Sequence, residues 1–228
     1  MRILVTGGLG YIGSHTTVEL LNKGFDVVIV DDLSNSKVNV FDKIKKITGK
    51  NPKLEIKDLK DKIEVVKLFR DYDFDGIIHF AAHKSVNESV NFPEKYLNNN
   101  VGSLENLLEN INKKMHFIFS SSCTVYGQAD KMPITEDFPI KKSESPYGET
   151  KQICESILKN FCDNNPNFNN ITLRYFNPIG AHSSGLIGEL PLGKPENLVP
   201  FLTQTAIGKR HQLIVFGDDY NTPDGTCI

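Results

Sequence analysis

Arg2-Ile3-Leu4-Val5-Thr6-Gly7-Gly8-Leu9-Gly10-Tyr11-Ile12-Gly13 opens the chain and decides its fold. A short apolar run leads into a glycine-rich turn, and a helical pattern then continues to Gly24. A second β-branched run at residues 27–30 ends at Asp31 and completes a strand–helix–strand unit, in which the two strands are parallel. This order predicts an α/β fold built on a doubly wound parallel sheet.

The glycines of this turn fit a phosphate-binding loop, since they match G-x-G-x-x-G from Gly8 and G-x-x-G-x-x-G from Gly7. Gly7 or Gly8 permits the tight turn, Gly10 lets the backbone approach a pyrophosphate, and Gly13 lets the helix pack on the strand. Asp31, at the tip of the second strand, is placed to accept hydrogen bonds from the adenosine ribose and would repel a 2′-phosphate. A glycine turn without a ligand is the alternative. Strand, helix and acidic residue together predict dinucleotide binding, with NAD favoured over NADP.

Strands and helices keep alternating beyond this unit. Apolar runs predict strands at residues 54–57, 76–80 and 116–119, and helical patterns fall at 63–69 and from Pro93 to about 111. Three adjacent amides, Asn98 to Asn100, interrupt the last pattern and are poor helix material, so we expect Asn99 to face the sheet edge. His79 and His83 are interpreted as core or turn residues. Lys84 is a candidate ligand contact, with a surface lysine as the alternative.

The stretch Ser145-Pro146-Tyr147-Gly148-Glu149-Thr150-Lys151 places a phenol and an ammonium four residues apart at a helix start. Ser145 predicts the cap and Pro146 the first turn. Tyr147 and Lys151 would share one helix face, where the cation can lower the pKa of the phenol. A tyrosine with such a pKa acts as an acid or base near neutral pH. A solvated helix face is the alternative.

Composition narrows the class of protein. The 228 residues carry a net charge of -2, with 39% hydrophobic and 24% charged residues, which argues against a nucleic-acid surface. The four cysteines form no C-x-x-C pair and no metal-ligand pattern with histidine, which indicates a reducing compartment. No signal-peptide layout opens the chain, and no apolar run approaches the ~18 residues that span a bilayer. We therefore expect a cytoplasmic protein with no membrane partner and no metal.

Several motifs together carry a family resemblance. In chain order they are TGGLGYIGSH (6–15), HFAAHKSV (79–86), FSSSCTVYG (119–127), SPYGETK (145–151) and LRYFNPIGAH (173–182). As a set they resemble the extended short-chain dehydrogenase/reductase family, and within it the UDP-glucose 4-epimerases. The resemblance implies a Rossmann-like domain, NAD as cofactor, a UDP-sugar substrate and a homodimer.

It also implies roles for individual residues. Tyr147 would be the catalytic base at the sugar 4-hydroxyl, Lys151 would hydrogen-bond the nicotinamide ribose, and Ser122 would hydrogen-bond the 4-oxygen. Contacts with the cofactor are implied for Gly7, Gly10, Tyr11, Ile12, Gly13, Asp31, Asp58, Leu59, Phe80, Ala81, Lys84, Asn99, Tyr147, Lys151 and Tyr175. Contacts with the nucleotide sugar are implied for Lys84, Ser122, Tyr147, Asn177, Asn197, Leu198 and Phe216.

We expect an NAD-binding domain at residues 1–176 and the beginning of a substrate-binding domain at 177–228, some of which packs back on the first. The family continues beyond the point that corresponds to Ile228, so we expect a C-terminally truncated chain that binds NAD better than it turns over substrate. Two alternatives remain. A nucleotide-sugar 4,6-dehydratase would need an acidic pair at Cys123-Thr124, and a non-catalytic NAD-binding module would keep the fold alone.

Overall fold

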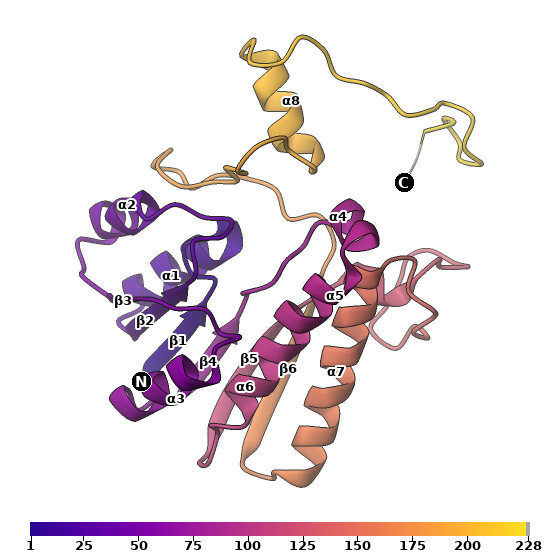
Figure 1. Cartoon of the computed structure of the whole chain (residues 1–228). Coiled ribbons are helices and arrows are strands. Elements are labelled where there is room, and N and C mark those ends of the chain that lie inside the picture. Colours follow the sequence, from indigo (N-terminus) through magenta and orange to yellow (C-terminus); the bar gives the residue numbers. More distant parts are fainter. Residues whose placement is uncertain (227–228) are drawn as a thin grey trace. The chain divides into compact units, whose positions relative to one another are not determined.

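The computed structural model describes residues 1–226 and divides into two compact units, Met1–Glu189 and Leu190–Ile228. The first unit is built on a single sheet of parallel strands in the order β3-β2-β1-β4-β5-β6 (Figure 1). The strands are β1 (Arg2–Thr6), β2 (Asp26–Asp31), β3 (Lys53–Ile56), β4 (Gly76–His79), β5 (Met115–Ser122) and β6 (Phe168–Tyr175). This is the strand order of dinucleotide-binding Rossmann folds, so the predicted fold class is confirmed.

Helices cover both faces of this sheet. The helices of the first unit are α1 (Tyr11–Asn22), α2 (Asn39–Thr48), α3 (Lys62–Asp71), α4 (Val86–Asn91), α5 (Pro93–Tyr96), α6 (Gly102–Leu108) and α7 (Pro146–Asn164), with a π-helix at Leu97–Val101 and a 3₁₀ turn at Cys123–Tyr126. Successive strand residues point to opposite faces. Ile3 and Val5 of β1 therefore join the core under α1 and α2, whereas Leu4 joins the core under α3, α6 and α7.

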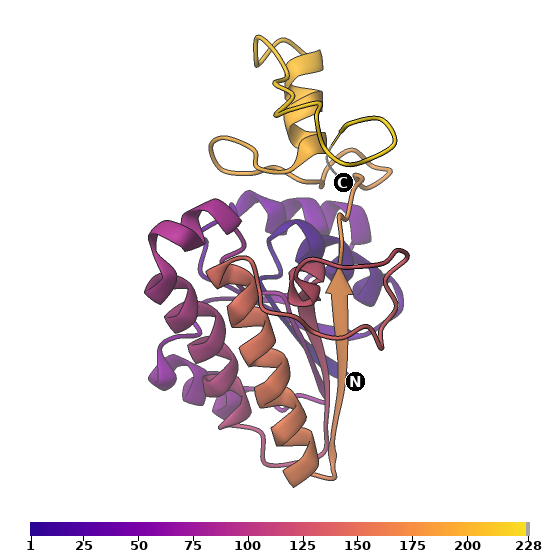
Figure 2. The same ribbon diagram turned by 90° about the vertical axis from the view of Figure 1, so that its right-hand side faces the viewer.

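Three elements of the first unit are not predicted from the sequence. They are α2, α4 and the edge strand β6 (Figure 2). Along β6 the side chain of Ile171 is 59% exposed, so the strand lacks the continuous burial that marks the central strands. Its signal in the sequence is a short alternation of polar and apolar residues around Ile171 and Leu173. In the structure this segment pairs with β5.

The first unit extends past the predicted domain boundary at residue 176. Residues 177–189 belong to the first unit, and Ile187 is buried beside the residues of α1 and α2. Ala181 and Gly188 pair in an isolated antiparallel bridge that closes this segment on itself. The second unit contains α8 (Leu198–Ala206), whose N-cap position is Asn197. The assignment of a substrate domain to 177–228 stays a prediction.

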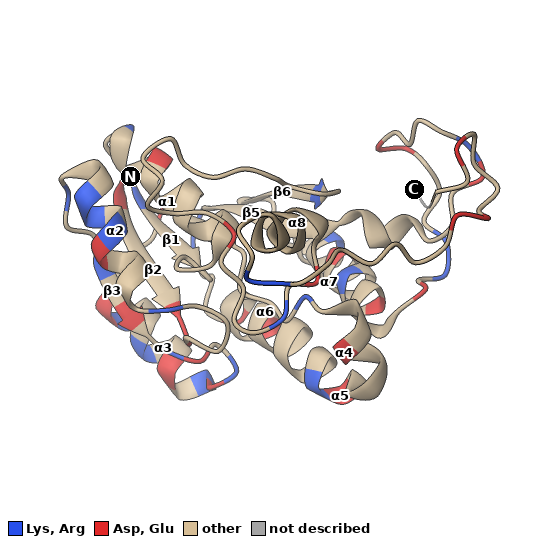
Figure 3. Ribbon diagram, turned by 90° about the horizontal axis from the view of Figure 1, so that it is seen from above, with Lys and Arg blue, Asp and Glu red and all other residues tan. Residues whose placement is uncertain are grey.

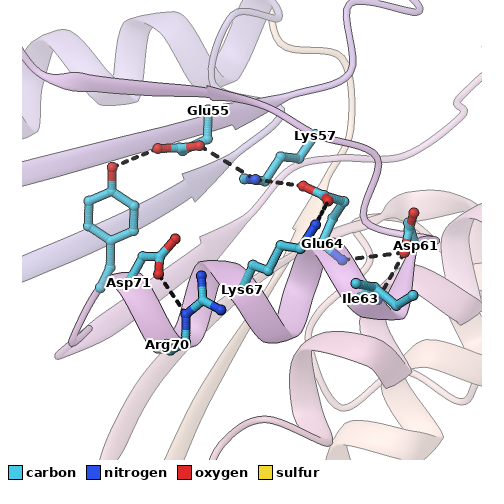
Figure 4. A network of polar contacts seen from close by, with 9 residues as sticks. Glu55, Lys57, Asp61, Ile63, Glu64, Lys67, Arg70 and Asp71 are labelled. Atoms are coloured by element: carbon cyan, nitrogen blue, oxygen red, sulfur yellow. Dashed lines mark hydrogen bonds and ion pairs between the residues drawn. The ribbon is translucent and has the colours of Figure 1, made fainter.

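The surface carries charges of both signs. Lysine and arginine alternate with aspartate and glutamate along α2, β3 and α3, as expected for solvated helix faces (Figure 3). Between β3 and α3, Lys57 bridges Glu55 and Glu64, and Lys67 also pairs with Glu64 (Figure 4). Such partly exposed pairs orient side chains and contribute modestly to stability. Within residues 1–226, none of the helices combines the length and apolarity that a membrane crossing needs.

His79 ends β4 and is a core residue, as interpreted from the sequence. Its side chain is 2% exposed, its Nδ1 lies 2.7 Å from the Thr6 hydroxyl, and its ring stacks on Phe119. Burial, together with the nearby Lys151 ammonium, lowers the pKa of His79 to about 3. The folded protein therefore keeps this imidazole neutral over the whole physiological range.

This burial predicts a pH dependence of stability. In the unfolded chain a histidine takes up a proton near pH 6.5, which folded His79 does not do until about pH 3. Its contribution is fully present above pH 6.5 and is lost as the pH falls through that window, at up to about 1.4 kcal/mol per pH unit. Urea unfolding of His79→Asn between pH 7 and 4.5 should show a shallower loss of stability than the parent protein.

His116→Asn provides the matched control, because His116 lies exposed on β5. The control should keep the slope of the parent. An unchanged slope in His79→Asn would mean that His79 is not the group responsible.

Candidate active site

The site is built where the sheet order reverses, at the carboxyl ends of β1 and β4. Gly7 adopts a left-handed conformation with φ of 63°, and a Cβ atom there would lie 2.8 Å from the Ala81 nitrogen. A Cβ atom at Gly13 would collide with the Gly7 carbonyl oxygen. The turn after β1 therefore contacts the backbone that follows β4, and only glycine permits this approach.

The first turn of α1 presents backbone N–H groups without a side-chain cap. Gly10 is the N-cap residue, makes no side-chain cap hydrogen bond and is followed by no acidic residue in the first turn. Tyr11 begins the helix, and its hydroxyl donates to the Gly180 carbonyl at 2.7 Å, which attaches the segment after β6 to this helix. Free N–H groups and the helix dipole favour an anion, so this turn fits a phosphate group.

Asp31 has a structural role that the sequence did not reveal. Its carboxylate is 7% exposed and accepts hydrogen bonds from the Leu9 N–H at 2.9 Å, the Leu33 N–H at 3.0 Å and the Ser36 hydroxyl at 2.7 Å. The bond to Leu9 braces the glycine turn directly. A carboxylate accepts about four hydrogen bonds, which leaves capacity for a ribose hydroxyl. Asp31 thus fits a bound nucleoside and also shapes the loop that would hold its phosphates.

Other predicted cofactor residues lie along the same strand ends. Asp58 follows β3 and accepts a hydrogen bond from the Lys60 N–H at 2.9 Å, and Leu59 beside it is buried. After β4, the Ala81 N–H donates to the Thr6 hydroxyl at 3.2 Å. Lys84 pairs with Glu189 at 3.4 Å. The structure therefore collects residues from three separate loops at one edge of the sheet.

The three asparagines form most of the π-helix that interrupts α5 and α6. Asn99 is 8% exposed, and its side-chain amide donates to the Asn100 carbonyl oxygen at 3.0 Å. Asn100 in turn accepts from the His83 N–H, and it donates to the His83 carbonyl oxygen and to the Thr150 hydroxyl. Asn100 was not singled out from the sequence, although the amide run was its signal. It joins the loop after β4 to α7.

Helix α7 carries the predicted catalytic pair. It begins as expected, because the Ser145 hydroxyl accepts from the Gly148 N–H at 3.1 Å and Pro146 occupies the first turn. Facing it are Ser120, Ser121 and Ser122 at the end of β5, which we call the serine run. The Lys151 ammonium donates to the Ser120 carbonyl oxygen at 2.8 Å and lies 5.9 Å from the centre of the Tyr147 ring.

The electrostatics of this pair differ from the expectation. Burial raises the pKa of Tyr147, and a hydrogen bond with the Ser122 side chain opposes that rise. Burial also lowers the pKa of Lys151 to about 8. In the chain itself desolvation therefore outweighs the charge effect inferred from the four-residue spacing. Cys123, next to Ser122, has its pKa raised by burial and is a neutral thiol.

The remaining predicted residues fall in two groups. Tyr175 ends β6, and burial raises the pKa of its phenol, while Asn177 is exposed in the segment that follows. Asn197, Leu198 and Phe216 belong to the second unit, and their part in a site stays a prediction. No cluster of metal-ligating side chains occurs among residues 1–226.

Comparison with known proteins identifies the family. A family model described as GDP-mannose 4,6 dehydratase matches residues 4–228. The chain is 50% identical to UDP-glucose 4-epimerase of Dictyostelium discoideum and 49% identical to that of Haemophilus influenzae, in both cases over 100% of its length. The crystal structure of UDP-glucose 4-epimerase from Bifidobacterium longum, in complex with NAD+ and UDP, has a TM-score of 0.95 and 44% identity over 99% of the chain.

The chain spans about two thirds of the length of these relatives, with 66% of the Dictyostelium protein, 68% of the Haemophilus protein and 68% of the Bifidobacterium structure covered. The chain belongs to the UDP-glucose 4-epimerase family.

Proposed function

We propose that the protein is an NAD-dependent UDP-glucose 4-epimerase, which inverts C4 of the sugar by transient oxidation to a 4-keto intermediate. The observation that carries this proposal is the meeting of Tyr147, Lys151 and Ser122 on facing elements, α7 and the end of β5. The named relatives and the NAD-bound Bifidobacterium structure support it.

The residues of the first unit fit NAD. The glycine turn and the first turn of α1 would hold the pyrophosphate, Asp31 would accept from the adenosine ribose, and Lys151 would hydrogen-bond the nicotinamide ribose. When bound, NAD supplies the acceptor for a hydride and returns it later in the cycle. Asp31 also brings a buried negative charge close to the ribose, which disfavours the 2′-phosphate of NADP.

Tyr147 and Ser122 perform the proton chemistry at the sugar. The Tyr147 phenolate removes the proton of the 4-hydroxyl as C4 is oxidised, and it returns a proton to the 4-oxygen when C4 is reduced from the opposite face. Ser122 donates a hydrogen bond to that oxygen. Because burial opposes the phenolate, the reaction depends on groups that stabilise negative charge at Tyr147, namely Ser122 and the Lys151 ammonium.

The rest of the proposal follows the family resemblance. Asn177, Asn197, Leu198 and Phe216 would contact the uridine diphosphate sugar, and Lys84 would lie beside both ligands. The active form would be a homodimer in the cytoplasm. Light scattering coupled to size-exclusion chromatography measures whether the protein is a dimer.

A 4,6-dehydratase would need an acid after the serine run, where this chain has Cys123 and Thr124. Neither residue carries a carboxylate. Cys123 is a thiol whose pKa is raised by burial, and the Thr124 hydroxyl is buried without a hydrogen-bond partner. The arrangement therefore favours epimerisation over elimination of water. The intact Tyr147, Lys151 and Ser122 favour an enzyme over a non-catalytic NAD-binding module.

Tyr147→Phe should lower the rate of conversion of UDP-galactose to UDP-glucose by a factor of about 10²–10⁴, because it removes the general base and keeps the ring. NAD content, measured after denaturation of the purified protein, should be unchanged. Tyr72→Phe is the matched control, since it removes a hydroxyl at the end of α3 that donates to Glu55 of β3. Full activity in Tyr147→Phe would refute the assignment.

Asp31→Ala should weaken NAD binding by about 10–100-fold, since hydrogen bonds to a charged group contribute about 1.5–3 kcal/mol. The preference for NAD over NADP should also become smaller, because the Asp31 carboxylate that would repel the 2′-phosphate is removed. Calorimetric titration with both cofactors measures these effects. Asp32→Ala controls for the loss of a neighbouring carboxylate, which is exposed and bonds Ser34. Equal affinities in Asp31→Ala and the parent would be incompatible with the ribose contact.

A further inference from the structure

Helix α7 contacts all three residues of the serine run through side chains spaced one turn apart. The Ser122 side chain interacts with Tyr147 and lowers its pKa against the effect of burial, Lys151 donates to the Ser120 carbonyl oxygen at 2.8 Å, and Glu155 accepts from the Ser121 hydroxyl at 2.6 Å. Residues four apart on a helix lie on one face, so Tyr147, Lys151 and Glu155 form one row against β5. Only Glu155 has no part in the proposed chemistry.

Glu155 is held more firmly than the other two. Its side chain is 11% exposed, and its two carboxylate oxygens accept from Nε and Nη2 of Arg174 at 3.0 and 2.7 Å. Arg174 precedes Tyr175 in β6, donates to the Tyr126 hydroxyl at 2.9 Å and lies 4.8 Å from the centre of the Tyr126 ring. Bidentate pairs of this kind fix geometry as well as charge. Glu155 thus connects α7, β5 and β6 at one point.

We propose that Glu155 is a positioning residue for the reaction, which fixes α7 on the serine run through Ser121 and Arg174 and so sets Tyr147 and Lys151 against Ser122. This inference rests on the proposed function. The row acts as a unit, because a shift of α7 along β5 at Glu155 moves the catalytic pair by the same amount. Misplacement of about 1 Å costs as much as 100-fold in rate.

The negative charge of Glu155 supports the same role as its hydrogen bonds. Lys151 faces His79 from β4, the Phe119 ring from β5, and Tyr147, Cys154 and Glu155 on its own helix. Burial lowers the pKa of Lys151 to about 8, and the negative charge of Glu155 opposes that change. The carboxylate therefore favours the ammonium form, which can both donate to the ribose and stabilise the Tyr147 phenolate.

Glu155→Gln tests the proposal by kinetics. Glutamine keeps an acceptor for Ser121 but loses the charge that pairs with Arg174. We expect kcat for UDP-galactose to fall about 10–100-fold, with KM and NAD affinity within about twofold of the parent. Glu149→Gln, at an exposed position of the same helix, is the control and should behave as the parent. An unchanged kcat in Glu155→Gln would overturn the proposal.

The Lys151 side chain gives a second measurement that needs no turnover. NMR titration of its ε-carbon in the resting protein should show a lower pKa in Glu155→Gln and no change in Glu149→Gln, a difference that loss of stability alone does not produce. An unchanged Lys151 titration in Glu155→Gln would count against the proposal. If Glu155→Gln does not fold, Ser121→Ala removes only the hydroxyl that bonds Glu155 and must lower kcat in the same direction.

The two hypotheses fail in different ways. A parent protein that binds no NAD and converts no UDP-galactose contradicts the proposed function. In that case the Lys151 titration alone decides whether Glu155 raises the pKa of Lys151. An active parent with a fully active Glu155→Gln variant contradicts only the positioning role.

Discussion

The structure depends on one close approach, between the backbone of the turn after β1 and the backbone that follows β4. Gly7, in its left-handed conformation, can lie against the Ala81 backbone because it has no Cβ atom. This approach joins the two halves of the sheet at the point where the strand order reverses. The same turn precedes the first N–H groups of α1, and Asp31 braces it through the Leu9 N–H.

The central fold was predictable because its signals are local. Buried parallel strands are continuous apolar runs, and the glycine turn, the strand lengths and the Ser145 cap each act within a few residues. The edge strand β6 was missed for the opposite reason, since only one side of it is paired and Ile171 remains exposed. Helix α2 buries Ile44 and little else, so its sequence looks like a charged surface.

The candidate site was predicted in its residue types but not in its interactions. Motifs indicated Asp31, Tyr147 and Lys151, yet the bracing of Leu9 by Asp31 spans 22 positions in the chain. The pKa of Tyr147 depends on how deeply the folded protein buries it, which a four-residue spacing does not determine. Asn100 and Glu155 act through partners on other elements, so a local pattern does not reveal what they bond; the run of amides marks the position of Asn100 but not its partners.

The bond between the Tyr11 hydroxyl and the Gly180 carbonyl oxygen has a thermodynamic consequence. It links the order of the segment after β6 to the order of the first turn of α1. A ligand that holds that turn still therefore stabilises the bond, and a closed segment in turn favours the same ligand by an equal free energy. The affinity of the ligand and the order of the segment are thus two measures of one coupled equilibrium.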